Sequence, residues 1–468
     1  MTLTALNAPM KSYTNELASF ASSLRIEDIP IQIIEHAKSC LLDTLGCGLF
    51  GSSLEWSQIL LRTMQRLGDS NQSIVWGTTR RLSADAAALV NGTMVHSYEL
   101  DDLHKRAIIH PGGVTIPALL AAMETTGPQS GNRLLTAIVA GYEVSIRVGM
   151  ATGLGLLHRG WHNNGVLGTF GGAAGVGSWL GLSVDQMIDA IGMAATQSAG
   201  LMSAQYGSMV KRMHAGRAAQ SGLYSAFLAS EGFRGIRNPF EADYGGFHET
   251  FTEEYDLNQL VVGLGTVWET GRVGFKPYSS CGSSHTSIDA VFKLQAEHQF
   301  EADDIESIRV FTSTATKDHV GWPYVVDSVT TAQMNLAYAI SCAVRYGRVF
   351  IDEFQPSRLK DPNLLRLTEK IEVVADPEID KKGRDFRHAI RLEIHMKDGT
   401  SLTAFVDHAK GSDVYPLTES ELQSKFEGLA SRILPPERVH RIIEAVHGLQ
   451  ELDDASQLVE MLVLPEER

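Results

Sequence analysis

The chain contains little cysteine: Cys40, Cys47, Cys281 and Cys342 are the four in 468 residues, and no CxxC pair occurs. Their spacing matches neither a zinc site nor a disulfide framework. Cys40 and Cys47 lie seven residues apart on one face of an expected helix, so we interpret both as buried core thiols. This cysteine usage favours a reducing, cytoplasmic compartment.

An excess of basic residues is also missing, because 40 Lys and Arg stand against 55 Asp and Glu, a formal net charge of −15. Nucleic acids and anionic membrane surfaces require a basic footprint, so we expect neither as a partner. The amino terminus, MTLTALNAPMKSYTNELASF, has no apolar signal region, and NGVLGTFGGAAGVGSWLGL is too rich in Gly and Ala for a convincing membrane span. We therefore expect a soluble protein, in which a local basic pocket can still bind a small anion.

Strand-like alternation is missing from the first half of the chain, where apolar residues recur at helical spacing to about residue 235. Beyond about residue 270, ESIRVFTST, KIEVVADPE and AIRLEIHMKDGTSLTAFVD alternate in the manner of strands, with Asp398-Gly399 as a hairpin turn. About fifty carboxy-terminal residues return to amphipathic helices that we expect to rejoin the first domain. The pattern predicts a mainly α fold, with a large all-helical domain and a smaller α+β domain.

A glycine-rich stretch, GVLGTFGGAAGVGSWLG, interrupts this helical half. Glycine destabilises a helix by roughly 1 kcal/mol relative to alanine, so this many glycines need a structural reason. A dinucleotide-binding fingerprint is one candidate, but the third glycine of GxGxxG and a preceding strand are both missing. We therefore predict a central helix that its neighbours approach closely, backbone against backbone.

The stretch HSYELDDLHKRAIIHPGG gathers acidic and imidazole side chains. They are His96, Glu99, Asp101, Asp102, His104 and His110. These residue types can bind a metal, but their spacing matches no HExxH, facial-triad or EF-hand pattern. The alternatives are a solvated helix end and a proton-transfer site in which carboxylates orient an imidazole. The residues alone leave all three interpretations open.

A second histidine motif, HRGWHNNG, places His162 at the start of the glycine-rich helix. Exposed N–H groups and the helix dipole attract an anion at such a position. A capping or core histidine is an equally good interpretation of this motif alone.

The segment AQYGSMVKRMHAG contains an SxxK pattern formed by Ser208 and Lys211. The SDN and KTG companions of serine acylases are missing, so we set that function aside. What remains is a cationic cluster of Lys211, Arg212 and His214 in an acidic protein, which suits a carboxylate ligand. A second cationic segment, VGFKPYSSCGSSH with Lys276, opens the second domain and is expected to face the first across a cleft.

These four segments, in this order, resemble the MmgE/PrpD family of 2-methylcitrate dehydratases, cis-aconitate decarboxylases and an iminodisuccinate epimerase. ELDD, GLMSAQYGSMVKR and VVGLGTVWET look most like the fungal cis-aconitate decarboxylase branch. The resemblance implies a helical domain from residues 1–267 with 411–468 and a lid domain from residues 268–410. It also implies a homodimer that works without a metal or organic cofactor.

The resemblance places the active site between the helical domain and the lid. It implies these catalytic residues: His110, His162, Asp101, Lys211 and Lys276. It implies these substrate-binding residues: Glu99, Leu103, Arg212, Tyr278, His285 and Trp322. His96 and His104 are expected to lie outside the site. Leu103 departs from the decarboxylases, which tend to carry Thr or Tyr there, and HVGWPYVVDSV around Trp322 and Tyr324 aligns only loosely with the family.

The family reactions share a carbanion-like centre beside a carboxylate, which cations stabilise and a positioned histidine protonates or deprotonates. We expect a cofactor-independent enzyme acting on a small anionic di- or tricarboxylate, with a cis-aconitate decarboxylase-like lyase as the best single interpretation. An epimerase of an iminodisuccinate-type dicarboxylate and a 2-methylcitrate-type dehydratase are the alternatives. A metal-dependent hydrolase and a non-catalytic carboxylate-binding protein are competing hypotheses from other classes.

Overall fold

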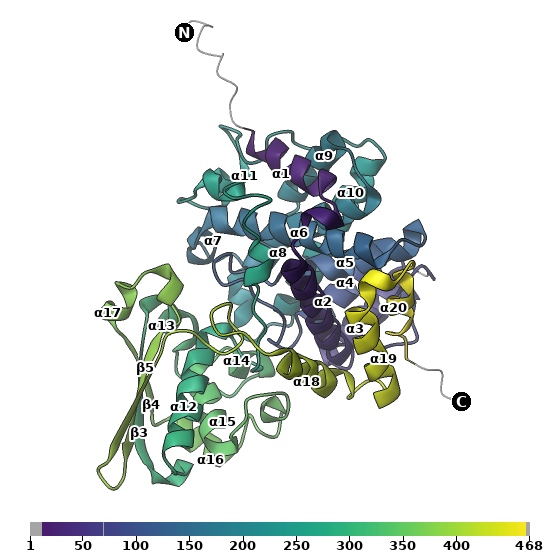
Figure 1. Cartoon of the computed structure of the whole chain (residues 1–468). Helices are drawn as coiled ribbons and strands as arrows, with labels where there is room; N and C mark the ends of the chain where they lie inside the picture. Colours follow the sequence, from purple (N-terminus) through teal and green to yellow (C-terminus); the bar gives the residue numbers. More distant parts are fainter. Residues whose placement is uncertain (1–11, 69, 465–468) are drawn as a thin grey trace, which may run out of the picture.

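The computed structural model describes residues 12–68 and 70–464, and it divides into a helical domain and a smaller domain built on a sheet (Figure 1). The helices of the first domain are α1 (Tyr13–Ser23), α2 (Ile31–Gly51), α3 (Glu55–Leu67), α4 (Ala84–Val95), α5 (Pro111–Thr126), α6 (Gly131–Thr152), α7 (Gly155–His158), α8 (Asn163–Leu180), α9 (Val184–Thr196), α10 (Val210–Ser230) and α11 (Phe247–Phe251). A two-stranded ribbon, β1 (Ser73–Ile74) and β2 (Arg81–Leu82), precedes α4. The predicted mainly helical fold class is confirmed.

The glycine-rich segment forms α8, which is buried along its length from Asn163 to Trp179. The α10 helix packs directly on it, and a Cβ atom added to Gly222 would lie 2.6 Å from the Cα atom of Gly172. On another face α10 approaches α4, where a Cβ atom on Gly92 would lie 2.7 Å from the Cα atom of Gly216. The prediction of a central helix with close backbone contacts is therefore confirmed.

The smaller domain contains a four-stranded sheet in the order β4-β3-β5-β6. Its elements are α12 (His285–Glu297), β3 (Ile305–Thr312), α13 (Thr314–Val320), α14 (Val329–Gln333), α15 (Leu336–Tyr346), α16 (Pro362–Thr368), β4 (Ile371–Ala375), α17 (Pro377–Asp380), β5 (Ile390–Met396) and β6 (Ser401–Val406). Strands β3 and β4 are parallel, and the other pairs are antiparallel. The predicted turn at Asp398-Gly399 connects β5 to β6, and Gly399 has a φ of +90° that favours glycine. Helix α12 packs on β5 and β6.

The carboxy-terminal helices lie beside the amino-terminal ones (Figure 1). They are α18 (Glu419–Ala430), α19 (Pro436–His447) and α20 (Ser456–Glu460). Both α18 and α19 pack on α2, and α20 packs on α5, so the end of the chain returns to the helical domain as expected. The boundaries at residues 267 and 410 stay predictions, although the chain does cross between the two domains near both positions. There Leu103 pairs with Gly274, and the Phe275 amide donates to the Gly411 carbonyl at 2.8 Å.

Among the described residues, α6 is the one helix long and apolar enough to cross a membrane by length and composition. Its apolar window is entirely buried inside the protein. Burial of this kind is typical of a core helix, which passes the same test.

We predict that Gly222→Ala destabilises the protein, because the added Cβ atom would lie 2.6 Å from the backbone nitrogen of Ala173 in α8. Overpacking of about 1–3 kcal/mol outweighs a gain in helix propensity of up to about 1 kcal/mol. Gly68→Ala is the matched control, since nothing lies within 4 Å of its added Cβ atom. Urea denaturation should show a lower midpoint for Gly222→Ala alone, and equal midpoints for the two variants would contradict the close-packing argument.

Candidate active site

A cavity of about 70 Å³ lies where the helical domain meets the lid. The helical domain lines it with Glu99, Leu103, Ile108, His110, Leu157, His162, Asn163, Asn164, Met202 and Lys211. The lid lines it with Lys276, Cys281, Gly282, Ser283, His319, Met334, Arg387 and His388. Six of the predicted site residues therefore meet around one cavity, from three segments of the helical domain and one of the lid. Their chemical roles stay predictions.

Two helices begin at this cavity, and each begins with a histidine. His110 is the N-cap residue of α5 and is followed by Pro111, whose fixed φ suits the first helical position. His162 is the N-cap residue of α8, as the sequence predicted. The backbone N–H of His110 donates to the Asn164 side chain at 2.9 Å, which ties the two helix starts together. Helix N-termini favour negative charge, so their convergence suits an anionic ligand.

The loop that carries the acidic residues has an unusual backbone at two positions. Glu99 and Ile108 have φ values of +56° and +55°, which non-glycine residues adopt uncommonly. Both side chains line the cavity. Such conformations cost free energy and persist where surrounding contacts hold them. At Glu99 those contacts are ionic.

The Glu99 carboxylate contacts three cations inside the protein. Its Oε1 atom accepts from Lys211 Nζ at 2.5 Å and from Arg212 Nη1 at 2.6 Å, and its Oε2 atom accepts from Lys276 Nζ at 3.2 Å. All four side chains are at least 95% buried. Burial alone would raise the pKa of Glu99, but the three cations hold that pKa well below its usual range. One carboxylate facing three cations leaves positive charge available for an anionic ligand.

The two lysines respond differently to this environment. Burial is the main influence on the pKa of Lys211 and lowers it, and Arg212 beside it adds to the shift despite Glu99. Burial also acts to lower the pKa of Lys276, but Glu99 and Asp101 together raise it. Lys276 is therefore cationic, and its ammonium group, which belongs to the lid, lies beside Glu99 and Asp101 of the helical domain.

Asp101 lies between two imidazoles. His96 Nδ1 is 2.7 Å from Asp101 Oδ2, and His110 Nδ1 is 3.4 Å from Asp101 Oδ1. Burial would raise the pKa of Asp101, but His110 and His96 hold it well below its usual range. Asp101 therefore lies behind His110, and its side chain does not line the cavity. Burial lowers the pKa of His96 to about 4. His96 does not line the cavity, but it contacts Asp101 behind the cavity.

The neighbouring acid, Asp102, has a different environment. Burial, together with Asp43 and Asp101, raises the pKa of Asp102 well above its usual range. Its oxygens accept from the Tyr142 hydroxyl at 2.8 Å and from the Gly112 amide. Asp102 is therefore a structural residue that fixes the start of α5 against α6.

The cluster of His96, Asp101 and His110 is also where a metal would fit best, since their ligand atoms lie within 4.8 Å of one another. The carboxylate, however, already pairs with both imidazoles, and His96 Nδ1 also contacts the Asn164 amide at 3.3 Å. His96 is therefore hydrogen-bonded to the carboxylate, while His110 lies within ion-pair distance of it without a hydrogen bond, and a carboxylate beside an imidazole is also a common arrangement for proton transfer. The absence of a metal stays a prediction.

The lid contributes a polar group that sequence reasoning missed. Ser283 lies 3.5 Å from His319 Nδ1 and 3.2 Å from His388 Nε2, and Arg387 Nε contacts His388 Nε2 at 2.9 Å. Burial lowers the pKa of His319 to about 4, with a further contribution from Arg387. His319 begins the segment HVGWPYVVDSV, and it lines the cavity, whereas Trp322 of the same segment does not.

Several predicted substrate-binding residues do not line the cavity. Arg212 lies behind Glu99 and also donates to Gln333 of α14 at 2.9 Å. Tyr278 donates to Asp289, and the indole of Trp322 donates to the His319 carbonyl at 3.2 Å. His285 lines a small adjoining cavity, where its Nε2 atom lies 3.1 Å from the Ser280 carbonyl. Their positions in this structure therefore give no support to direct substrate contact by these four residues.

Two further expectations concern histidines and Leu103. His104 lies outside the cavity, as expected, and its Nε2 atom contacts Glu269 at 3.2 Å. His214 was predicted to join a cationic cluster, but burial lowers its pKa to about 4, so it is neutral near pH 7. Leu103 does line the cavity, and its backbone pairs with Gly274 where the chain enters the lid. The departure at Leu103 therefore changes the surface that a ligand would meet.

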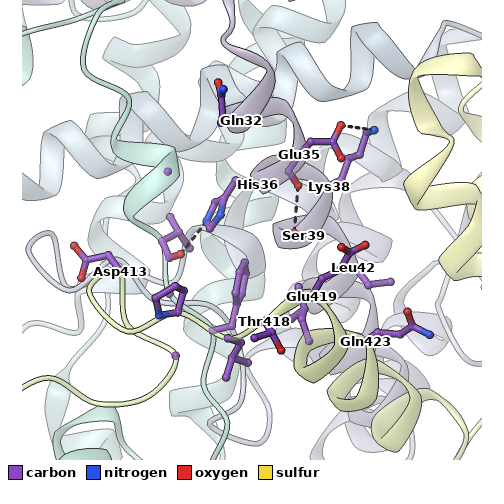
Figure 2. Close-up of a pocket in the computed structure, with 18 of the residues that line it drawn as sticks. Gln32, Glu35, His36, Lys38, Ser39, Leu42, Asp413, Thr418, Glu419 and Gln423 are labelled. Atoms are coloured by element: carbon purple, nitrogen blue, oxygen red, sulfur yellow. Dashed lines mark hydrogen bonds and ion pairs between the residues drawn. The ribbon is translucent and has the colours of Figure 1, made fainter.

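A larger cavity, of about 590 Å³, lies elsewhere, between α2, α18 and the two crossings between domains (Figure 2). In it, His36 Nε2 contacts the Val273 carbonyl at 2.9 Å, and Lys38 pairs with Glu35. None of the predicted catalytic residues lines this cavity. Its size alone does not make it the active site, because the convergent cations and imidazoles lie at the smaller one.

Comparison with known proteins is consistent with this geometry. Residues 15–259 match the MmgE/PrpD N-terminal domain, and residues 278–451 match the MmgE/PrpD C-terminal domain. The chain belongs to the MmgE/PrpD family.

This MmgE/PrpD protein is 35% identical to a cis-aconitate decarboxylase-like protein of Aspergillus oryzae, over 97% of this chain and 98% of that protein. It is 33% identical to the cis-aconitate decarboxylase of Aspergillus terreus, over 97% and 96%. A 2-methylcitrate dehydratase of Escherichia coli is 25% identical, over 88% of each chain. The predicted likeness to the fungal decarboxylase branch is confirmed, and the relatives named here are lyases.

We predict that Glu99→Gln lowers the free energy of unfolding at pH 7 by about 3–5 kcal/mol, because three buried cations lose their carboxylate. Since the folded pKa of Glu99 lies below its unfolded value, this stabilisation is present above pH ~4.3 and is lost as the pH falls through the folded value. The difference between wild type and variant should therefore be constant from pH 6 to 7 and shrink below about pH 4.

Denaturant titrations at several pH values measure this difference. Glu378→Gln is the control, because Glu378 pairs with Lys381 in solvent and such pairs contribute about 0–1 kcal/mol. Equal stability of Glu99→Gln and Glu378→Gln at pH 7 would contradict the role assigned to the buried cluster.

Proposed function

We propose that the chain is a cofactor-independent lyase that decarboxylates cis-aconitate or a closely similar tricarboxylate. One observation carries the proposal: two imidazoles, His110 and His162, and two buried lysines, Lys211 and Lys276, line the same small cavity. Cations stabilise charge that develops on carboxylate oxygens, and an imidazole can deliver a proton to carbon. The fungal relatives, which are named for this reaction, support the choice of substrate.

The chemistry of this substrate fits the residues around the cavity. Breaking the bond between the methylene carbon and its carboxylate releases carbon dioxide and leaves an electron pair. That pair forms a new double bond to the central carbon, and the original double bond shifts its electrons to the carbon beside the far carboxylate. One proton then binds that carbon, and a five-carbon dicarboxylate results. The reaction needs a cationic environment for the developing charge and one proton in each turnover.

The reaction needs charge stabilisation and proton delivery, and the surroundings of each residue indicate which of the two it would perform. Lys276 and Lys211 would bind the carboxylate beside the carbon that gains the proton, since Glu99 neutralises only part of their charge. His110 lies 3.4 Å from the Asp101 carboxylate, and its ring can donate a hydrogen bond to a further carboxylate oxygen of the substrate. His162 is assigned the proton delivery. Burial, with Lys211 nearby, lowers the pKa of His162 well below its usual value, so the ring is neutral near pH 7 and readily passes on a proton that it receives.

Leu103 departs from the decarboxylase pattern, so this position does not favour decarboxylation over the alternative reactions. An apolar side chain there withholds a hydrogen bond that the hydroxyl of a Thr or Tyr would supply. Dehydration of a 2-methylcitrate-type substrate requires protonation of a leaving hydroxyl, and epimerisation requires proton transfer on both faces of one carbon. Dehydration and epimerisation are both alternative outcomes of the experiment below. The bacterial 2-methylcitrate dehydratase among the relatives is the reason to include dehydration.

We predict that the wild-type protein, after exhaustive chelation, releases carbon dioxide from cis-aconitate in D2O and places one deuterium beside a carboxylate of the product. His110→Ala should lower kcat by about 10²–10⁴-fold, as expected for loss of a charge-stabilising or acid–base group. NMR follows substrate, product and deuterium in the same sample, and circular dichroism verifies folding.

His440→Ala serves as the control, because His440 is exposed on α19, away from the cavity. The same panel offers 2-methylcitrate and iminodisuccinate. Dehydration or α-proton exchange without carbon dioxide would replace the proposal by the corresponding alternative. Loss of turnover on chelation would favour the metal-dependent hypothesis, and full activity of His110→Ala would refute the role given to His110.

A further inference from the structure

One histidine in contact with the site has no task in the mechanism above. His214 lies on α10, three residues after Lys211, and its Nδ1 atom is 2.9 Å from the Nδ1 atom of His162. The ring centroids are 5.1 Å apart. His162 is buried, whereas His214 is half-buried. The pair therefore connects a residue that lines the cavity to one that reaches toward the surface.

A contact of this length between two Nδ1 atoms requires one proton between the rings, because two bare nitrogens repel and two N–H groups clash. Burial lowers the pKa of His214 to about 4 and that of His162 well below 6.5, so both rings are neutral near pH 7. Their tautomers are then coupled. When His214 carries the shared proton, His162 carries its own proton on Nε2 and can donate it into the cavity.

The surrounding backbone holds this pair in place. The His162 amide donates to the Gly200 carbonyl at 2.9 Å. Gly200 has a φ of +144°, and a Cβ atom there would lie 3.2 Å from His214 Nδ1. The segment before α10 therefore holds the backbone of His162, and a side chain at residue 200 would crowd the His214 ring. Lys211, on the same helix, is the charged group that acts on His214.

His162 and His214 belong to a longer row of imidazoles. The centroid separations are 5.0 Å from His110 to His96, 5.4 Å from His96 to His162, and 5.1 Å from His162 to His214. The row begins beside Asp101 and ends at the half-buried ring. Decarboxylation consumes one proton in each turnover, and the cavity lies beneath the lid, so the acid needs a supply of protons.

We propose that His214 is a positioning residue that sets the tautomer of His162 and passes protons from solvent to it. A solvent acid, hydronium or a protonated buffer, gives a proton to His214 Nε2 and is left as its conjugate base. The Nδ1 proton of His214 moves to Nδ1 of His162, and the Nε2 proton of His162 moves to the substrate carbon. Both rings end neutral, with their protons on the opposite nitrogens, and exchange with solvent after product release restores the starting tautomers. The inference rests on the proposed function, in which His162 is the proton donor.

The test compares His214→Ala, His214→Asn and wild type, each with and without added imidazole. Without His214, kcat should fall about 10- to 100-fold while KM changes by less than about 2-fold, because proton supply is lost and substrate binding is kept. Imidazole should restore kcat of His214→Ala in a saturable manner, and substituted imidazoles should do so in the order of their basicity. An asparagine amide can replace the hydrogen bond at Nδ1 but cannot pass a proton through, so His214→Asn should stay impaired.

His298→Ala is the matched control, since His298 is exposed in the lid, and imidazole should leave its rate unchanged. Full activity of His214→Asn, or of His214→Ala without imidazole, would overturn the proposal. Wild type is assayed first, so a failure of cis-aconitate turnover there contradicts the proposed function and not the pairing of His214 with His162.

A second readout needs no turnover. The 15N chemical shifts of the His162 ring report which nitrogen carries the proton. In wild type we expect a proton on one nitrogen and a coupling across the shared hydrogen bond to His214 Nδ1. In His214→Ala that coupling should be lost and the tautomer populations should change. Unchanged His162 shifts in the variant would overturn the positioning role even if the enzyme acts on a different carboxylate.

Discussion

The contact between the Glu99 carboxylate and three buried cations is the interaction on which the rest of the site depends. Two of the cations come from the start of α10, and the third comes from the first segment of the lid. None of these four groups is stable in a buried position without the others, because an unpaired buried charge costs several kcal/mol. The loop between α4 and α5, the α10 helix and the lid must therefore come together as one unit. Their surplus of positive charge is what makes the cavity suitable for a carboxylate.

The same environment gives two similar residues different properties. His110 and His162 both begin a helix and both line the cavity, but His110 faces a carboxylate and His162 faces a neutral imidazole. A neutral partner allows a proton to move along a hydrogen bond without creating a fixed charge. In the proposed mechanism, the residues behind the cavity thus give His110 a substrate-binding role and His162 the proton delivery.

Much of the fold and part of the site could be predicted from the sequence. Helical spacing and the Asp398-Gly399 turn are local patterns that predict secondary structure. The glycines of α8 are a local pattern that predicts close packing between helices. Four residues that line the cavity were predicted because their motifs occur in the order found in the MmgE/PrpD family. They are His110, His162, Lys211 and Lys276.

What could not be predicted depends on contacts between distant segments. Arg387 and His388 stand just before β5 in an ordinary-looking stretch, and only the sheet brings them to the cavity. His214 lay within a motif, but the sequence suggested a cation, because the burial that keeps its ring neutral is a property of the folded chain. Arg212 was chosen for its charge, and that charge is directed at Glu99 and the lid.

The proposed mechanism requires that the cation-rich cavity beneath the lid, and not the larger cavity beside α2, binds the carboxylates of the substrate. A crystal structure with propane-1,2,3-tricarboxylate, a saturated analogue of cis-aconitate, distinguishes the two cavities. We expect carboxylate oxygens within hydrogen-bonding distance of Lys211 Nζ and Lys276 Nζ, beside the imidazoles of His110 and His162. An analogue bound in the cavity lined by His36 and Lys38, or bound without contact to either lysine, would contradict the proposed mechanism.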